Sequence, residues 1–354
     1  MDEGDFTKAR SILFPRNVLV GHGVLGQIPE VCRDFGLCGA ALLVTGPKTR
    51  DVASEKIEMR LRDAGYDVHS VVVGEATREN LDKVEETARE VRADFLIGIG
   101  GGSKIDLAKM AAKDLGVEFI SVPTSASHDG IASGRASIKG EDGPLSLDAK
   151  VPLGVVADTS VIVQAPYRLL ASGCADVISN STAVRDWEFA RKLRGEEFSR
   201  SAYSLAVYTA ETIIDNADII KPYQEESVWV AIRPIIISGI SMSVAGSSRP
   251  TSGSEHMFSH AMDKLCPGKG LHGEQCGLGS IMMMYLHGGD WKRIRDALVK
   301  IGAPTTAKEL DIPREKIIEA LVTAHKVRSR FTILGQEGLT QEAAERLATI
   351  TGVI

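Results

Sequence analysis

The chain has 354 residues, of which 44% are hydrophobic and 5% aromatic, a composition typical of a globular protein with enough apolar side chains for two sizeable cores. It carries 41 Lys and Arg against 47 Asp and Glu, a net charge of −6, and the lack of long runs of either sign excludes a nucleic-acid-binding surface of clustered basic residues. The acidic start, Met1 to Asp5, has no basic segment followed by an apolar one, which excludes a secretory signal and predicts a cytoplasmic protein.

Short apolar runs alternate with amphipathic segments over the first 160 residues. Residues 79–91, for example, place apolar side chains at helical spacing with Glu and Lys on the other face. This alternation predicts a parallel, doubly wound sheet with a crossover helix after each early strand. The expected strands are residues 17–20, 40–44, 68–73, 95–99, 119–122 and 155–157.

A glycine turn, Gly100-Gly101-Gly102-Ser103, follows the fourth of these strands, and Ser103 is a good N-cap for a helix over 104–115. Glycines let the backbone approach a pyrophosphate, and free N–H groups at a helix start stabilise its negative charge. Compared with a dinucleotide fingerprint, however, Ser103 replaces the third glycine and the motif does not follow the first strand. A tight turn that binds nothing is the alternative.

The fifth strand ends in a loop rich in hydroxyl groups, which includes Thr124, Ser125 and Ser127 and leads to Asp129. Ligands of open parallel sheets bind at this edge, so the hydroxyls could donate to cofactor oxygens and Asp129 could accept from a substrate hydroxyl. A polar surface loop is the alternative. Between Ile138 and Val151, the segment Lys-Gly-Glu-Asp-Gly-Pro predicts a hairpin.

After Asp158 the strand pattern stops, and helical segments are expected to the end of the chain. We therefore predict an α/β domain over residues 1–160 and an all-helical domain over residues 161–354. The most apolar stretch, 228–244, contains Arg233-Pro234 and is shorter than the roughly 20 residues that span a bilayer, so it predicts a buried helix and no membrane insertion. The expected helices are 167–194, 198–217, 224–245, 254–264, 291–302, 314–326 and 341–351.

Three histidines fall within a short stretch: His256 and His260 lie four residues apart on one helical face, and His272 follows after a Pro-Gly loop. Two imidazoles at this spacing can ligate zinc, but the glutamate precedes the first histidine, which argues against a protease of the His-Glu-x-x-His type. Asp176, a lone carboxylate in an apolar helical segment, is the best oxygen ligand. Surface histidines remain the alternative. The five cysteines are an odd number without zinc-finger spacing, which predicts reduced thiols.

Taken together, Gly-Gly-Gly-Ser103 with Asp106, the Thr124-to-Asp129 loop, Asp176, His256 and His272 resemble the iron-dependent alcohol dehydrogenase and dehydroquinate synthase superfamily over nearly the whole chain. Within it, Arg249-Pro-x-Ser-Gly-Ser-Glu-His256-x-x-Ser-His260 and Leu271-His-Gly-Glu-Gln275 are similar to the archaeal sn-glycerol-1-phosphate dehydrogenases.

This resemblance implies a dehydroquinate synthase-like fold, with a Rossmann-like N-terminal domain, a helical C-terminal domain and self-association. It further implies a zinc ion held by Asp176, His256 and His272, with iron or nickel as possible substitutes. Asp129, Asp176 and His260 would face the substrate as catalytic residues. NAD(H) or NADP(H) would be contacted by Gly100, Gly101, Gly102, Ser103, Lys104, Ile105, Asp106, Thr124, Ser125, Ala126, Ser127 and Ser133.

The relatives that prefer NAD tend to carry an acidic residue after the second strand, whereas this chain has Thr45-Gly46-Pro47-Lys48. Because nothing there repels a 2′-phosphate, we expect NADPH to be used at least as well as NADH.

The reaction implied by the resemblance is reduction of dihydroxyacetone phosphate to sn-glycerol 1-phosphate, with zinc polarising the carbonyl. The proton could come from His260 or from a zinc-bound water relayed by Asp129. For the substrate phosphate, Arg249 and the N–H groups of residues 252–254 at a helix start suggest an anion site; the alternative is an ordinary ion pair of Arg249.

Three other functions stay open at this point. A glycerol dehydrogenase would apply the same chemistry to an uncharged polyol. A dehydroquinate synthase-like lyase would use NAD only transiently, but its site needs more basic residues. A metal- or nucleotide-binding protein without enzymatic activity would leave the joint presence of the two motifs unexplained.

Overall fold

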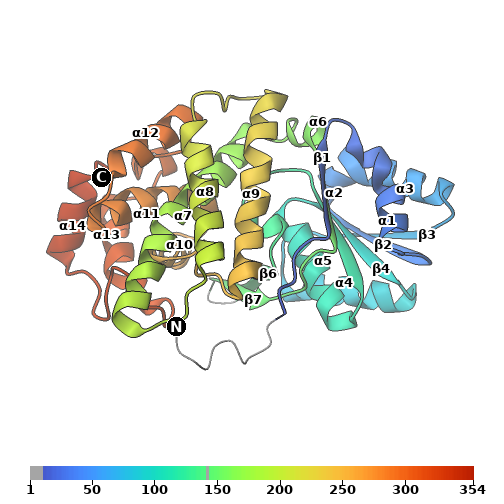
Figure 1. Cartoon of the computed structure of the whole chain (residues 1–354), viewed down its shortest axis with the longest axis horizontal. Helices are drawn as coiled ribbons and strands as arrows, with labels where there is room; N and C mark the ends of the chain where they lie inside the picture. The colour runs from blue at the N-terminus through green and yellow to red at the C-terminus, as the bar shows by residue number, and fades with distance from the viewer. Residues whose placement is uncertain (1–10, 141–142) are drawn as a thin grey trace.

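The computed structural model describes residues 11–140 and 143–354, so the acidic segment Met1 to Asp5 and the central hairpin residues Glu141 and Asp142 lie outside the described residues. All six predicted strands are present and form one parallel sheet in the order β1-β8-β5-β4-β2-β3 (Figure 1). Their bounds are β1 (Asn17–Gly21), β2 (Ala40–Thr45), β3 (Asp67–Val72), β4 (Phe95–Gly100), β5 (Glu118–Pro123) and β8 (Gly154–Asp158).

Helices cover both faces of this sheet, which explains why its central strands are apolar at every position rather than at every second one. In β2, Leu42 packs into a cluster with the side chains of α4 and α5, while Leu43 packs into the opposite cluster with α1 and α3. The helices of this part are α1 (Ile28–Asp34), α2 (Pro47–Thr49), α3 (Glu55–Asp63), α4 (Arg78–Glu90), α5 (Gly102–Leu115) and the short α6 (Thr159–Ile162).

The predicted hairpin is confirmed: β6 (Arg135–Gly140) and β7 (Gly143–Asp148) pair in antiparallel fashion apart from the main sheet. It is inserted between β5 and β8, which are neighbours in the sheet. The hairpin therefore extends from the edge where the glycine turn and the hydroxyl-rich loop end.

Every described element after β8 is helical. One hydrophobic cluster runs from Leu42 of the sheet to Val353 near the C-terminus, so the helical part packs directly on one face of the α/β part. The long helices are α7 (Tyr167–Arg194), α8 (Arg200–Asp215), α9 (Glu225–Ala245), α10 (Ser254–Leu265), α11 (His272–Leu286), α12 (Trp291–Ile301), α13 (Arg314–Thr323) and α14 (Gln341–Ile350).

Helix α11 is absent from the sequence prediction, because Gly273, Gly277 and Gly279 lower the intrinsic helix propensity of this segment. The structure shows what two of these glycines allow. A Cβ atom on Gly273 would lie 1.9 Å from the carbonyl oxygen of Ser172 in α7, and one on Gly279 would lie 3.0 Å from the backbone of Glu255 in α10. The glycines permit close helix packing, which stabilises a helix that is locally weak.

Helix α9 is the predicted apolar helix, and by length and composition alone it could cross a membrane. A core helix of a globular protein passes the same test. About half of its most apolar window, 56%, is buried, and it packs against α7 and α8. Pro234 lies inside it.

Candidate metal and nucleotide site

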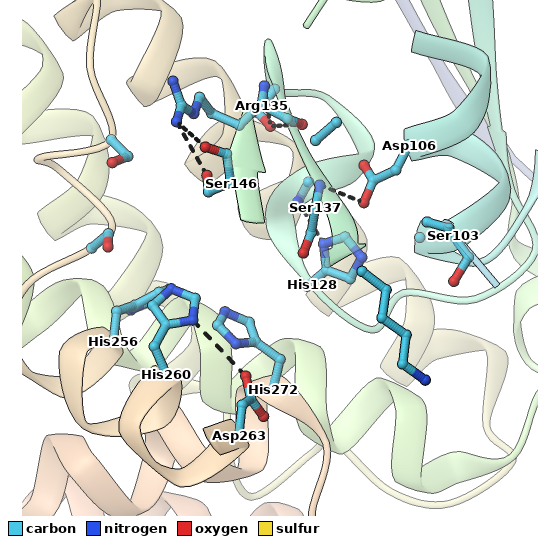
Figure 2. A pocket seen from close by; sticks show the side chains of 18 of the residues that line it. Ser103, Asp106, His128, Arg135, Ser137, Ser146, His256, His260, Asp263 and His272 are labelled. Carbon is cyan, nitrogen blue, oxygen red and sulfur yellow. Dashed lines mark hydrogen bonds and ion pairs between the residues drawn. The ribbon is translucent and has the colours of Figure 1, made fainter. Parts of the chain in front are cut away.

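A cleft of about 900 Å³ lies between the glycine turn and hairpin on one side and helices α10 and α11 on the other (Figure 2). Residues more than a hundred positions apart in the sequence meet in it. Of the predicted site residues, the cleft is lined by Gly102, Ser103, Asp106, Asp129, Ser133, His256, His260 and His272.

The three predicted metal ligands converge at the cleft. The Nε2 atoms of His256 and His272 each lie 3.7 Å from Oδ1 of Asp176. Two ligands on a tetrahedral zinc ion, with bonds of about 2.1 Å, would stand roughly 3.4 Å apart. The donor atoms are therefore spaced as a single small cation requires.

Hydrogen bonds orient both imidazoles toward that point. Nδ1 of His256 lies 3.0 Å from Oε1 of the buried Glu255. Nδ1 of His272 lies 3.2 Å from the hydroxyl of Ser259, which itself donates to Oε1 of Gln275. When Nδ1 carries the ring's proton and donates it in these hydrogen bonds, Nε2 is unprotonated and faces Asp176. This is the arrangement of a metal-ligating histidine.

The charge state of the group also fits a divalent cation. Burial and the nearby carboxyl of Asp176 raise the pKa of Asp129 to about 7, and burial likewise raises the pKa of Asp176 to about 7. Burial lowers the pKa of His256 and of His272, so both are neutral ligands. Two buried carboxyls beside uncharged imidazoles are stabilised by a positive ion.

Cys276 joins this group: its sulfur and one donor atom from each of the three predicted ligands lie within 4.8 Å of one another. It lies one helical turn after His272, with Sγ 3.7 Å from Nε2 and 3.9 Å from Nδ1 of that ring. The sulfur is therefore in contact with the imidazole ring of His272. The i, i+4 spacing would have indicated this neighbour if residues 272–286 had been predicted as a helix.

His260 lines the cleft beside this group, but its ring centre is 6.5 Å from that of His256 and it does not belong to the cluster of donor atoms. Its Nδ1 is 3.9 Å from Asp263 and has no hydrogen-bond partner among the described residues. Burial lowers the pKa of His260, so its imidazole is neutral at pH 7.

On the opposite side, the glycine turn delivers the start of α5 to the cleft, where the first N–H groups have no partners within the helix. The N–H of Thr124 donates to the carbonyl of Gly100 at 3.0 Å, which holds the hydroxyl-rich loop against the turn. Gly101 is the N-cap residue, so the predicted capping role of Ser103 is wrong by two positions. The side chains of Ile105 and Ala126 are buried in the hydrophobic core, so they do not reach the cleft.

His128 was not among the predicted site residues, although it directly precedes Asp129 in the same loop. Its Nδ1 accepts a hydrogen bond of 2.9 Å from the N–H of Gly130, which leaves the proton on Nε2. Burial, with smaller contributions from His272 and Lys109, lowers the pKa of His128 to about 3. A Cβ atom on Gly102 would lie only 2.0 Å from Nε2, so a neutral N–H donor sits directly over the start of α5.

The fully buried Lys109 connects the loop after β5 to the start of the hairpin by hydrogen bonds. Nζ of Lys109 donates to the carbonyls of Gly130, Ser133 and Arg135 at 2.5, 3.2 and 2.8 Å. It also lies 3.4 Å from Asp106, whose other oxygen accepts from the backbone of the hairpin. Asp106 thus positions the hairpin, in addition to lining the cleft.

The anion site inferred around Arg249 is corrected by the structure. The Arg249 guanidinium is paired with both carboxylate oxygens of Glu196, donates to the carbonyl of Phe331, and faces a separate pocket. The N–H groups of Gly253 and Ser254, expected to bind phosphate, donate instead to Glu255 and Asp186. The protein's own carboxylates thus occupy the Arg249 guanidinium and two of the three N–H groups that the hypothesis required.

Comparison with known proteins agrees with this architecture. A family described as iron-containing alcohol dehydrogenase matches residues 19–166. The fold is shared with the solved structure of glycerol dehydrogenase from Schizosaccharomyces pombe, with a TM-score of 0.80 at 21% identity over 97% of this chain and 90% of that one. It is also shared with a probable glycerol dehydrogenase from Sinorhizobium meliloti, with a TM-score of 0.78 at 21% identity over 97% and 98% of the two chains.

Similarity in sequence is much greater to a set of archaeal proteins named glycerol-1-phosphate dehydrogenase [NAD(P)+]. The relative from Methanosarcina mazei is 55% identical, covering 98% of this chain and 97% of its own. The relative from Methanothermobacter thermautotrophicus is 54% identical, covering 98% and 99%, and that from Haloarcula marismortui is 50% identical, covering 99% and 100%. With matches of this extent, the chain belongs to the glycerol-1-phosphate dehydrogenase family.

Proposed function

We propose that this protein reduces dihydroxyacetone phosphate to sn-glycerol 1-phosphate with NADPH or NADH, reversibly and with zinc, and so supplies the glycerophosphate backbone of archaeal membrane phospholipids. The observation that carries this proposal is that one cleft is lined both by the start of α5 and by His256 and His272, whose donor atoms converge with that of Asp176. A dinucleotide bound at the start of α5 would be within reach of a substrate carbonyl bound beside these three donors. The names of the archaeal relatives support the same reaction.

Asp176, His256 and His272 would hold the zinc ion, which supplies positive charge for the oxygen of the substrate carbonyl as hydride arrives at carbon. The protein's own part is to present the Nε2 lone pair of both imidazoles to the cleft. Glu255 and Ser259 favour this tautomer by accepting hydrogen bonds from the two Nδ1–H groups.

The charge states favour Asp129 over His260 as the proton carrier. Because the pKa of Asp129 is raised to about 7, this carboxyl can hold a proton at neutral pH and release it. The hydroxyl of Ser238 donates to its Oδ2 at 2.8 Å and fixes the carboxyl at the cleft. His260, whose pKa is lowered, is unprotonated at the same pH and is better suited to contact substrate than to donate a proton.

The test is a steady-state assay of purified protein, stripped with a chelator and then reloaded with zinc, with dihydroxyacetone phosphate and NADPH. We expect turnover only after reloading, and a product that a coupled assay identifies as sn-glycerol 1-phosphate rather than its enantiomer. Reduction of dihydroxyacetone but not of its phosphate would identify a glycerol dehydrogenase instead. Product formation without net NAD(P)H consumption would identify a lyase.

We also propose that the protein self-associates in the cytoplasm. Ile12, Leu13 and Phe14 are exposed in succession just before the edge strand β1, a pattern that favours coverage by another surface. None of the five cysteines is in a disulfide, as expected for a reducing compartment.

A further inference from the structure

Arg328 brings a guanidinium group to the cleft without a carboxylate partner among the described residues. It lines the same cleft as the three histidines, and the one hydrogen bond that its guanidinium makes to a described residue is a long contact of 3.5 Å between Nη1 and the hydroxyl of Ser252. A half-buried guanidinium carries five N–H donors, so most of its hydrogen-bonding capacity is unused. An arginine in this state needs an anion to offset its desolvation.

A second guanidinium is close by. Arg135, at the start of the hairpin, also lines the cleft; its terminal nitrogens are engaged by Asp148 and Ser146, but its buried Nε–H has no partner among the described residues. Burial and the positive charge of Arg135 lower the pKa of Arg328. Arg330 adds to the same field, and its own pKa is lowered to about 9 by burial and by Arg328 and Arg249.

This concentration of positive charge lies near the metal group rather than beside the glycine turn. Arg328 contacts the hydroxyl of Ser252, four residues before His256 in the segment that leads into α10, and it lines the cleft together with the three histidines. The cofactor's pyrophosphate, by contrast, would bind at the start of α5, which lies on the opposite wall of the cleft (Figure 2). A second anionic group is therefore expected next to the reacting carbonyl.

We propose that Arg328, assisted by the hydroxyl of Ser252 and by the positive charge of Arg135, binds the phosphate group of the substrate and sets the preference for a phosphorylated over an uncharged ketone. This inference rests on the proposed function, and it moves the phosphate site from Arg249 to a residue that the cleft actually exposes. A planar guanidinium can hold two phosphate oxygens at once, which fixes orientation as well as charge. An uncharged polyol or ketone would leave Arg328 unpaired, so the same residue would make glycerol and dihydroxyacetone poorer substrates than their phosphates.

The experiment compares Arg328→Ala and Arg328→Lys with wild type, using zinc-loaded protein and NADPH, on dihydroxyacetone phosphate and on dihydroxyacetone. Lys326→Gln is the matched control, since it removes a positive charge two residues away on an exposed side chain that does not line the cleft. Inorganic phosphate is titrated as an inhibitor of dihydroxyacetone reduction in each variant. Turnover of dihydroxyacetone also reports that each variant is folded.

We expect Arg328→Ala to lower kcat/KM for dihydroxyacetone phosphate on the order of 100-fold, as loss of hydrogen bonds to a charged group implies, with that for dihydroxyacetone unchanged or raised. Arg328→Lys should recover part of the loss, inhibition by inorganic phosphate should weaken in Arg328→Ala, and Lys326→Gln should match wild type. Equal losses on both ketones, or unchanged inhibition by phosphate, would overturn the assignment of Arg328.

Failure of the proposed function has a different signature, because it would appear in the wild type as no preference for the phosphorylated ketone. In that case the binding of inorganic phosphate, measured without any ketone, tests whether Arg328 forms an anion site. Protection of wild type but not Arg328→Ala against thermal unfolding by phosphate would uphold it, and equal protection would reject it.

Discussion

Gly273 offers the sharpest test of how the metal site is built, because it lies directly after a proposed ligand where α11 crosses α7. A Cβ atom at this position would meet the carbonyl oxygen of Ser172 at 1.9 Å, whereas ordinary contacts begin at 3.4 Å. Gly273→Ala must therefore part the two helices locally by about 3.4 − 1.9 = 1.5 Å. The obstacle is backbone, so no side-chain rotation can relieve it.

This displacement acts on both metal affinity and stability. Nε2 of His272 on α11 and Oδ1 of Asp176 on α7, the two atoms that would bind the ion, are 3.7 Å apart. Metal–ligand distances at a zinc site vary by only about 0.2 Å. We expect zinc affinity to fall on the order of 100-fold, the upper range for disturbed ligand support. Overpacking costs about 1–3 kcal/mol, and the better helix propensity of alanine offsets roughly 1 kcal/mol of it.

Zinc affinity is measured by competition with a chromogenic chelator, and stability by thermal unfolding of the metal-free protein. Gly277→Ala is the matched control on the same helix: its Cβ would lie 3.2 Å from the Cβ of Ala175, so the neighbour need move by only a few tenths of an ångström and both effects should be much smaller. If Gly273→Ala binds zinc as tightly as wild type and melts at the same temperature, the close approach of the helices does not support the site.

Three further outcomes are expected. Asp176→Asn should abolish zinc retention and lower kcat more than about 100-fold while NADPH binding, followed by fluorescence, survives; full activity in this variant would remove Asp176 from the ligand set. Lys48→Glu should lower the ratio of kcat/KM for NADPH over NADH roughly tenfold, since an acidic side chain after β2 would oppose the 2′-phosphate, with the exposed Lys56→Glu as control; an unchanged ratio, or a strong NADH preference in wild type, would contradict the cofactor prediction. Asp158→Asn should cost about 1–3 kcal/mol of unfolding free energy at neutral pH, because the carboxylate accepts from the N–H groups of residues 23, 25 and 160. Burial opposes ionisation of Asp158, but these hydrogen bonds outweigh it and lower its pKa; its contribution is therefore complete above about pH 4 and lost as the pH falls through the lowered pKa. The check is the free energy of unfolding from urea titrations at neutral and at acid pH. If variant and wild type differ by the same amount at both, the carboxylate of Asp158 does not act in this way.

Local regularities in the chain were enough to predict much of this protein. All six strands were predicted from short apolar runs, and α7 was predicted with its observed bounds, Tyr167–Arg194, because hydrophobic periodicity and helix caps are encoded by neighbouring residues. Errors at other helix ends were small: the segment predicted as 198–217 is helical from Arg200 to Asp215, with Ser199 as its cap. The metal group of Asp176, His256 and His272 was also named from sequence, through a motif order matched over the whole chain.

What the sequence could not reveal are the contacts between residues far apart in it. Arg249 looked available for phosphate, yet its partner Glu196 comes from a distant segment, and the competing Arg328 lies almost eighty residues further on in a stretch without a motif. The segment of α11 contains too many glycines to be predicted as a helix, but those glycines allow α7 and α10 to pack closely against it. Local periodicity determined the strands and helices, whereas the pairing of charges and the fit of backbones across helices were decided only by tertiary packing, because both depend on distances between elements that no local pattern encodes.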